Sequence, residues 1–585
     1  MYLLLLLFLS LPVCAQTALP PNRETLIVTG TYDPLPLEEA ERNIRAFPAR
    51  DMQLVTNTFA DLMYLDSSLD MRQRAAGAVQ SGLSIRGGGF GQTLVLLDGI
   101  RMNDVQSMNH DMDIALPPFA ISSMEVLKGS GSTLYGSDAV AGVVNFRTHI
   151  PEGSEFRLRS ALGNFGVNQE SGAFSFHRRS FAEQISFSRD FSTGFAPDRD
   201  YRNLSLASLT NWNHTHITLA LNDRPFGADQ FYGNYNSWER TKTWFAGVHQ
   251  NLGDQTEITF GYRRHSDLFV LFRDRPEYFT NRHVDQSFQL ALRRTEKLPK
   301  NFRLHYGAEV LHESIDSNNL GQHSRNRGAG YVALDIRALR RFSFTAGVRA
   351  EIYNDTEKQF SPSVGAGYWL TQKIKFKASA SRAFRLPSYT DLYYHDPSNV
   401  GSPNLRPETA WSYEGGVDIN SGGKLRGEFT VFERREHDGI DYVRNSPTDV
   451  WRATNFQKLN FTGLEAAVVY KGLDFRYTGI HGAQDQLGAA QSKYVFNYPV
   501  HSGLVSWKIQ SKKGVFFRTR MGVLERYGRD PYGVWDIYVA YSKKRVHPFL
   551  QLTNLTDTYY EEILGVRTPG RGIVGGLEWV VYQKK

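Results

Sequence analysis

Side chains in the C-terminal three quarters of the chain alternate between apolar and polar over long stretches. In residues 302–310 (FRLHYGAEV) the even-numbered positions are apolar, whereas the odd-numbered positions are Arg, His, Gly and Glu. Residues 342–352 and 288–292 repeat this pattern. Because only a β-strand places alternate side chains on opposite faces, the pattern predicts a mainly β region over residues 149–585.

The length of the alternating stretches separates two β architectures. Strands of stacked soluble sandwiches also alternate, but they average about five or six residues, whereas several stretches here reach about ten. Within each alternating stretch, the charged residues occupy only the positions of the polar face. This placement suits a lipid-facing apolar side, where a charge would cost about 2–4 kcal/mol at the midplane. At about 20 residues for each strand with its connection, this region predicts a transmembrane barrel of about 22 antiparallel strands, a size typical of plugged barrels.

The N-terminal quarter lacks this alternation. Residues 3–11 form an apolar run before Val13-Cys14-Ala15, too short for a membrane helix, and residues 1–15 are therefore predicted to be a signal peptide. A lipoprotein signal at Cys14 is the alternative, although Val13 is bulky for it. Residues 58–65 have helical spacing, and short apolar runs end at glycine-rich turns. We predict an extended segment over residues 16–30 and a compact mixed α/β domain over 31–148, able to plug the barrel.

Composition and motifs exclude several function classes. The 585 residues include 67 basic and 60 acidic side chains, and the net charge of +7 is dispersed, unlike that of a nucleic-acid-binding protein. The only cysteine is Cys14, so the chain beyond the predicted signal peptide has no thiolate chemistry. P-loop and HExxH motifs do not occur, and the adjacent Glu561 and Glu562 would point to opposite faces of a strand. The sequence predicts that the protein is not an enzyme.

Five stretches resemble a known family, the TonB-dependent outer-membrane receptors. They are ETLIVTG (24–30), SIRGGGFGQTLVLLDGIRMND (84–104), MEVLKGSGSTLYGSDAVAGVVNF (124–146), SRAFRLPSYTDLYY with PNLRPETAWSYEGG (381–416) and LTNLTDTYYEEILGVRTPGR (552–571). The resemblance covers nearly the whole chain beyond the predicted signal peptide. It implies a monomeric barrel in the outer membrane of a Gram-negative bacterium, with an N-terminal plug in its lumen and a small-molecule ligand. It also implies contact with outer-membrane lipid, lipopolysaccharide and the barrel assembly machinery, and no nucleic-acid partner.

By this resemblance, a segment near the N-terminus is the TonB box, which the C-terminal domain of TonB binds in order to pull on the plug. The segment follows Pro20-Pro21 and is short and rich in β-branched residues, so its main chain can join an exposed sheet edge as an added strand. A plain N-terminal strand of the plug is the alternative. The predicted box residues are Glu24, Thr25, Leu26, Ile27 and Val28.

Two plug loops are predicted to contact the ligand. Residues 87–92 hold four glycines among six residues, which favours an irregular loop with positive φ, with a tight turn free of ligand as the alternative. Residues 101–113 hold three methionines and one histidine, a set that suits an adaptable contact surface, copper coordination or ordinary packing. The predicted contacts are Gly88, Gly89, Phe90, Gly91, Gln92, Met108, Asn109, His110 and Met112.

Residues 222–241 of the barrel are predicted to form a turn-rich connection that carries aromatic side chains. Aromatic residues on an exposed loop can grip a large ligand, whereas a membrane-interface belt is the alternative. Asp223 and Asp229 would allow a calcium site, without specific spacing. Apart from calcium or copper as alternatives, no cofactor or metal is predicted. The aromatic contacts predicted on this connection are Phe231, Tyr232, Tyr235 and Trp238.

Four charged plug residues, Arg86, Glu125, Asp138 and Arg147, match family positions that pair with the barrel wall, and we expect a structural role for them. The predicted function is active import of a scarce, large ligand. Chain length and the stretches at 403–416 and 566–571 most resemble the cobalamin receptor group. A ferric siderophore or haem receptor is the alternative. A copper importer is a further, less favoured alternative, and the plug motifs disfavour a passive porin or an adhesin.

Overall fold

A computed structural model describes most of the chain. The described residues are 26–27, 29–32, 34–48, 56, 58–89, 91–107, 109–339, 341–354, 357–421, 425–484 and 491–584. The predicted signal peptide and part of the predicted sites lie outside them. The site residues outside the described set are Glu24, Thr25, Val28, Phe90 and Met108.

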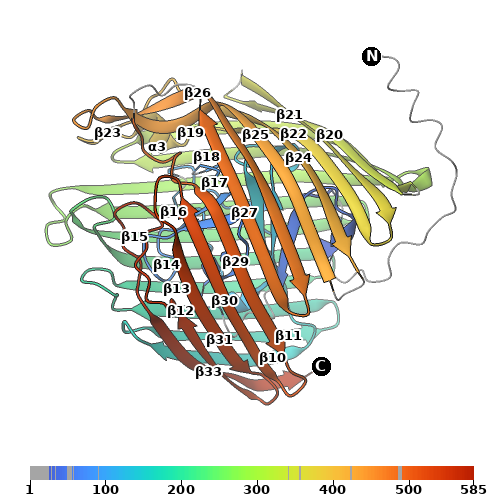
Figure 1. Ribbon diagram of the computed structural model, residues 1–585, viewed down its shortest axis with the longest axis horizontal. Helices are drawn as coiled ribbons and strands as arrows, with labels where there is room; N and C mark the ends of the chain where they lie inside the picture. The colour runs from blue at the N-terminus through green and yellow to red at the C-terminus, as the bar shows by residue number, and fades with distance from the viewer. Residues whose placement is uncertain are drawn as a thin grey trace.

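Twenty-two long antiparallel strands close into one barrel around the N-terminal domain, which confirms the predicted architecture (Figure 1). The barrel closes where β10 (Ser154–Gly163) pairs with β33 (Gly572–Lys584). Two short strands, β23 (Asn399–Val400) and β28 (Gln491–Ser492), pair beside long strands. The other strands are β11 (Asn168–Arg178), β12 (Phe181–Ser192), β13 (Tyr201–Trp212), β14 (Thr215–Asp229), β15 (Asn236–Leu252), β16 (Thr256–Val270), β17 (Thr280–Lys297), β18 (Phe302–Ser317), β19 (Gly321–Leu339), β20 (Phe342–Tyr353), β21 (Glu357–Thr371), β22 (Ile374–Arg385), β24 (Glu408–Asn420), β25 (Leu425–Arg444), β26 (Trp451–Tyr470), β27 (Leu473–Gln484), β29 (Pro499–Gln510), β30 (Val515–Arg526), β31 (Tyr532–Tyr541) and β32 (Val546–Thr553).

The two faces of each long strand follow the parity predicted from the sequence. On β18, Tyr306 and Val310 point outward and are 38% and 56% exposed, whereas the inward-facing His305 and Glu309 are 1% and 8% exposed. An apolar outer face around a polar interior is the arrangement that a barrel in lipid requires. No helix of the described residues is long and apolar enough to span a membrane.

The N-terminal domain has a five-stranded mixed sheet, in the order β3-β8-β9-β6-β7, and a two-stranded ladder, β4-β5. Its buried face joins Val95, Met124, Val144 and Phe146 in one apolar core. The helix predicted over residues 58–65 is a single turn, α1 (Ala60–Met63). The remaining elements are β1 (Leu26–Ile27), β2 (Leu35–Pro36), η1 (Leu37–Glu39), β3 (Ile44–Pro48), β4 (Leu69–Arg72), β5 (Gly82–Ile85), β6 (Thr93–Leu97), β7 (Ile100–Arg101), η2 (Pro118–Ala120), β8 (Ile121–Lys128), α2 (Ser132–Tyr135) and β9 (Gly142–Thr148).

The barrel has two unlike ends. At the first, which we call the turn end, strands connect through short turns such as residues 179–180 and 471–472; η3 (Pro299–Asn301) lies here. At the second, the loop end, connections such as residues 386–407 are longer, and this one carries α3 (Tyr389–Tyr393). The first barrel strand begins six residues after β9 ends at Thr148, with Ser154 as its first residue.

Candidate functional site

The glycine-rich loop at residues 87–92 is irregular, as predicted, and lies against the barrel wall. Gly87 and Gly91 both have a φ of +73°, and a Cβ added to Gly88 would lie 2.6 Å from Ala141 Cβ. Gln92 is buried, and its amide donates to Glu408 at 3.0 Å and to Glu436 at 3.1 Å. Gly88 and Gly91 are buried, whereas Gly89 is partly exposed. The described part of this loop therefore docks the plug and leaves little surface for a ligand.

The second predicted loop, residues 101–113, lies beneath the connection that carries α3. The amide of Tyr389 donates to Val105 O at 3.0 Å, and the amide of Thr390 donates to Gln106 O at 2.8 Å. Met112 belongs to the apolar plug core, as does Met102. Of the predicted contacts described in this loop, Asn109 is partly exposed, whereas His110 and Met112 are 3% and 4% exposed.

The predicted connection at residues 222–241 is mostly strand. β14 continues to Asp229 and β15 begins at Asn236, which leaves a turn at residues 230–235. The residues in this region differ in placement. Phe231 is buried against Phe226 and Tyr201, and Tyr232 donates to Glu239 at 2.7 Å.

The other two aromatic residues of this hairpin point away from the plug. Tyr235 is 40% exposed and packs edge-on against Phe272 at the loop end. Trp238 shares the outward parity of Trp244, because it lies between the inward-facing Ser237 and Glu239. The hairpin therefore divides its aromatic side chains between the plug contact, the loop end and the outer face.

The two carboxylates named for the calcium alternative lie apart on one strand. Asp223 accepts two hydrogen bonds of 2.7 Å from Arg240. Asp229 lies six residues further along the same strand, about 20 Å away by strand geometry, so the two carboxylates do not converge.

Of the four plug charges expected to pair with the barrel, Arg86 does so. Its Nε lies 2.6 Å from Glu465 Oε1 and its Nη1 lies 3.2 Å from Glu414 Oε2, both on barrel strands. Burial lowers the pKa of Arg86, but the two carboxylates outweigh burial and raise it.

The other three charges have hydrogen bonds or ion pairs inside the plug, and the Asp138 carboxylate also lies in the field of the barrel arginines Arg327 and Arg385. Arg147 lies 3.4 Å from Asp98, Glu125 accepts from the Thr29 amide at 2.7 Å, and Asp138 pairs with Arg101. Only the backbone amide of Asp138 reaches the barrel among the hydrogen bonds described for these three residues, donating to Phe384 O at 2.9 Å.

A further docking pair was not predicted. Asp70 on β4 contacts Arg526 on β30 at 2.7 Å. Burial raises the pKa of Asp70, but Arg526 and Arg72 outweigh burial and lower it. The two residues lie 456 positions apart, so no local sequence pattern could join them.

A cavity of about 260 Å³ separates this part of the plug from the barrel. Its lining includes Tyr64, Asp70, Arg526 and Glu562, and Tyr64 donates to Glu562 at 2.7 Å. Burial raises the pKa of the Glu562 carboxyl to about 7. None of the predicted ligand contacts that the structure describes lines this cavity.

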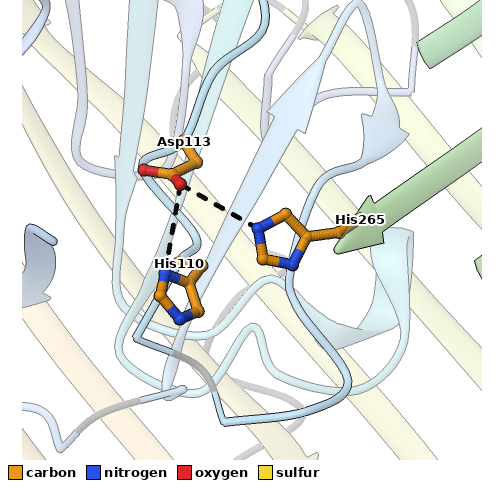
Figure 2. Close-up of side chains that lie close together, drawn as sticks. All are labelled: His110, Asp113 and His265. Carbon is orange, nitrogen blue, oxygen red and sulfur yellow. Dashed lines mark ion pairs between the residues drawn. The ribbon is translucent and has the colours of Figure 1, made fainter. Parts of the chain in front are cut away.

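His110 faces a different part of the wall. Figure 2 shows His110 and Asp113 of the plug opposite His265 of β16. The nearest nitrogen of each ring lies 3.9 Å from Asp113 Oδ2. The sequence indicated His110 but gave no signal for His265, which is 155 residues away.

Comparison with known families accounts for both parts of the molecule. Residues 36–143 match the TonB-dependent Receptor Plug Domain, and residues 167–555 match the TonB dependent receptor-like beta-barrel. The chain belongs to the TonB-dependent receptors. These are outer-membrane proteins of the transporter and receptor class, which confirms the predicted family and location.

Curated relatives of this receptor carry two different kinds of name. The Vitamin B12 transporter BtuB of Vibrio vulnificus is 24% identical over 77% of this receptor and 76% of the relative. The Iron-regulated outer membrane virulence protein of Vibrio cholerae is also 24% identical, over 75% and 72% of the two chains. The solved siderophore receptor PirA of Acinetobacter baumannii has the same fold, with a TM-score of 0.75, 13% identity and coverage of 92% and 98%.

Family membership also orients the receptor. Outer-membrane barrels have short periplasmic turns and longer extracellular loops, so the loop end faces outward and the turn end faces the periplasm. The connection with α3 therefore covers the plug from the extracellular side.

Proposed function

We propose that this receptor imports a scarce, large ligand with energy supplied through TonB, and that the ligand is cobalamin. The observation that carries the import mechanism is that a folded plug occupies the barrel and is attached by buried ion pairs such as Arg86–Glu465 and Asp70–Arg526. A passive porin of comparable width keeps a water-filled channel. Passage of a large ligand therefore requires the plug to rearrange.

We weigh two ligand classes. A vitamin B12 transporter favours cobalamin, in agreement with the stretches at 403–416 and 566–571. A ferric siderophore or haem is the second candidate, and one relative is named for regulation by iron, although its name states no ligand.

The size of the internal cavity favours ligand binding above the plug. Pockets for drug-sized ligands span about 300–1,000 Å³, and the cavity beside Asp70 is smaller, at about 260 Å³. A larger ligand would rest on the loop end, where the partly exposed Gly89 and Asn109 of the plug and Tyr235 of the barrel are available.

The N-terminal segment supports the coupling to TonB. Leu26 and Ile27 form β1 and pair with Pro36 and Leu35 of β2. A segment that already pairs through its main chain can exchange that partner for a strand of TonB. Ligand binding would release this pairing and present residues 24–28 to the periplasm.

A binding panel tests the ligand. Detergent-purified receptor is titrated calorimetrically with cyanocobalamin, a ferric catecholate siderophore, a ferric hydroxamate siderophore and haem. We expect saturable nanomolar binding of cyanocobalamin alone. Tight binding of an iron complex alone would replace cobalamin with the second candidate, and no binding to any compound would overturn both.

A deletion tests the coupling. Removal of residues 24–28 is expected to abolish uptake of the bound ligand by energised cells while surface binding persists. Removal of residues 18–22 is a control of equal length that keeps the predicted box and is expected to preserve uptake. Normal uptake without residues 24–28 would contradict the proposed TonB box.

A further inference from the structure

Two imidazoles and a carboxylate converge where the plug meets the barrel wall. His110 Nδ1 and His265 Nε2 each lie 3.9 Å from Asp113 Oδ2, and all three ligand atoms lie within 4.8 Å of one another (Figure 2). The three side chains are 3%, 0% and 4% exposed for His110, His265 and Asp113. Two of them belong to the plug and one to β16, so the group bridges the two parts of the receptor.

Both ring nitrogens that face Asp113 lack hydrogen-bond partners among the described residues. Buried polar atoms are normally paired, and each such orphan calls for an explanation. A distance of 3.9 Å is too long for a hydrogen bond, but it leaves space for an atom between the three groups.

The outer nitrogen of each ring faces further carboxylates. His265 Nδ1 lies 2.7 Å from Asp104 Oδ2 and 3.3 Å from Asp285 Oδ1. A proton on Nδ1 would leave the lone pair of Nε2 directed toward Asp113. Carboxylates orient metal-binding histidines in this way.

His110 has a similar environment. Its Nε2 lies 3.6 Å from Glu239 Oε1 and 3.8 Å from Asp267 Oδ2. Asp113 itself is held by an ion pair with Arg224 and by a 2.6 Å hydrogen bond from Thr241. The three inner groups are therefore positioned by their own contacts.

The carboxylates around the two imidazoles outnumber the guanidinium groups that pair with them. Five carboxylates lie within 4 Å of the two imidazoles, and two guanidinium groups pair with them. Unpaired charge is costly to bury. One divalent cation between neutral imidazoles, or a proton on each imidazole, would supply two positive charges against this excess of three carboxylates. The carboxylates are Asp104, Asp113, Glu239, Asp267 and Asp285, and the guanidinium groups are those of Arg224 and Arg263.

We propose that His110, Asp113 and His265 bind one divalent transition-metal ion of the zinc type, which fastens the plug to the barrel wall. Two imidazoles and one carboxylate suit Zn²⁺ and Co²⁺, whereas Ca²⁺ takes oxygen ligands only and Cu(I) prefers sulfur. Bonds of about 2.0–2.2 Å place tetrahedral ligand atoms about 3.4 Å apart, so each of the two 3.9 Å distances to Asp113 needs to close by about half an ångström. A water molecule would complete the four ligands.

The bridging position determines what the ion would do. It joins the plug loop at residues 103–113 to β16, beneath the α3 connection that already holds Val105 and Gln106. The ion would oppose movement of this loop away from the wall, whichever ligand the receptor imports.

Metal content tests the proposal directly. Receptor without an affinity tag is treated with chelator, incubated with one equivalent of Zn²⁺, passed through a desalting column and analysed by inductively coupled plasma mass spectrometry. We expect one Zn²⁺ per chain, and visible d–d absorption of tetrahedral Co²⁺ after replacement. The apparent melting temperature should fall on chelation and recover with Zn²⁺.

Variants locate the ion. His110→Ala and Asp113→Asn are expected to weaken Zn²⁺ binding at least about tenfold, and Asp104→Asn, which leaves all three ligands in place, by about tenfold. His312→Ala is the matched control, because His312 is partly exposed on the outer face and contacts Asn326. Folding of each variant is checked by heat-modifiable migration in electrophoresis.

Two outcomes would overturn the proposal. In the first, the chelated wild-type receptor binds no Zn²⁺ or Co²⁺ and its melting temperature ignores both, which would leave protonated imidazoles as the source of charge. In the second, His110→Ala binds Zn²⁺ as tightly as wild type or no more weakly than His312→Ala. Neither result depends on the imported ligand or on uptake.

Discussion

The plug meets the barrel through two kinds of contact that differ in what completes them. At the first, Arg86 and Arg526 neutralise the carboxylates that face them, and guanidinium groups stay charged at any physiological pH. At the second, His110 and His265 leave two buried ring nitrogens without hydrogen-bond partners among the described residues. The arginine contacts carry their positive charge within the chain, whereas the proposed histidine site takes its positive charge from an added ion or from protons. The two attachments should therefore respond to different conditions.

The largest effect is expected from Arg86→Ala. This change leaves Glu465 and Glu414 buried without their guanidinium partner, and loss of one member of a buried pair costs about 3–5 kcal/mol. Amide hydrogen exchange of the plug, followed by mass spectrometry, should show faster exchange by a corresponding factor, with or without chelator.

The control for this prediction removes an arginine from an exposed pair. Arg435 is 56% exposed and lies 2.8 Å from Glu433. Arg435→Ala breaks this contact and should cost less than about 1 kcal/mol. If the plug amides of Arg86→Ala exchanged no faster than those of Arg435→Ala, the arginine contacts would not hold the plug.

A smaller effect is expected from Glu562→Gln. Glu562 lines the same cavity as Asp70 and Arg526, so this variant tests whether the stability of this plug–barrel contact depends on pH. The raised pKa of Glu562, about 7 in the folded receptor, lies above an unfolded value of about 4.3. Protonated Glu562 therefore contributes stability that is fully present below about pH 4 and is lost as pH rises through 7. The loss over this whole pH window amounts to at most about 4 kcal/mol.

Heat-modifiable electrophoresis across pH 5 to 8 checks this prediction. Wild type should lose apparent melting temperature over this range, and Glu562→Gln should lose less. If the melting temperatures of the two proteins fell equally with pH, Glu562 would not be the source of the pH dependence.

The smallest effect is expected from Tyr64→Phe. The hydroxyl of Tyr64 donates to Glu562 at 2.7 Å. The backbone N–H of Gln73 donates to the other oxygen of the same carboxylate, also at 2.7 Å. Loss of one of two donors should cost about 1 kcal/mol, measured by the same exchange experiment. A cost as large as that of Arg86→Ala would mean that neutral hydrogen bonds hold the plug as strongly as ion pairs.

Sequence reasoning predicted the barrel because its signal is local. Alternation such as that of Tyr306 with His305 repeats every two residues and shows which face meets lipid. The hairpin at residues 222–241 was mistaken for a loop because Pro225 and Gly227 resemble turn residues. A Cβ at Gly227 would lie 2.2 Å from Asp198 O, so this glycine permits close approach of the backbone around Asp198.

The contacts between plug and barrel were harder to predict because their members are far apart in the chain. His110 was singled out for its neighbouring methionines, yet Met102 and Met112 pack in the plug core and its actual neighbours come from β15 and β16. Asp70 and Arg526 carry no motif at all. Only the closed barrel brings such residues together.

The short pairing of β1 with β2 has a mechanical consequence. Leu26 and Pro36 form the open end of this hairpin, and Pro36 has no N–H to contribute to that pair. Tension applied upstream of Leu26 would unzip the two pairs one after the other, which needs less force than shearing them together. Load would reach the apolar cluster of Leu35, Ile44 and Leu127 only afterwards. The β1–β2 hairpin would thus open and extend before any force reaches the sheet of the plug.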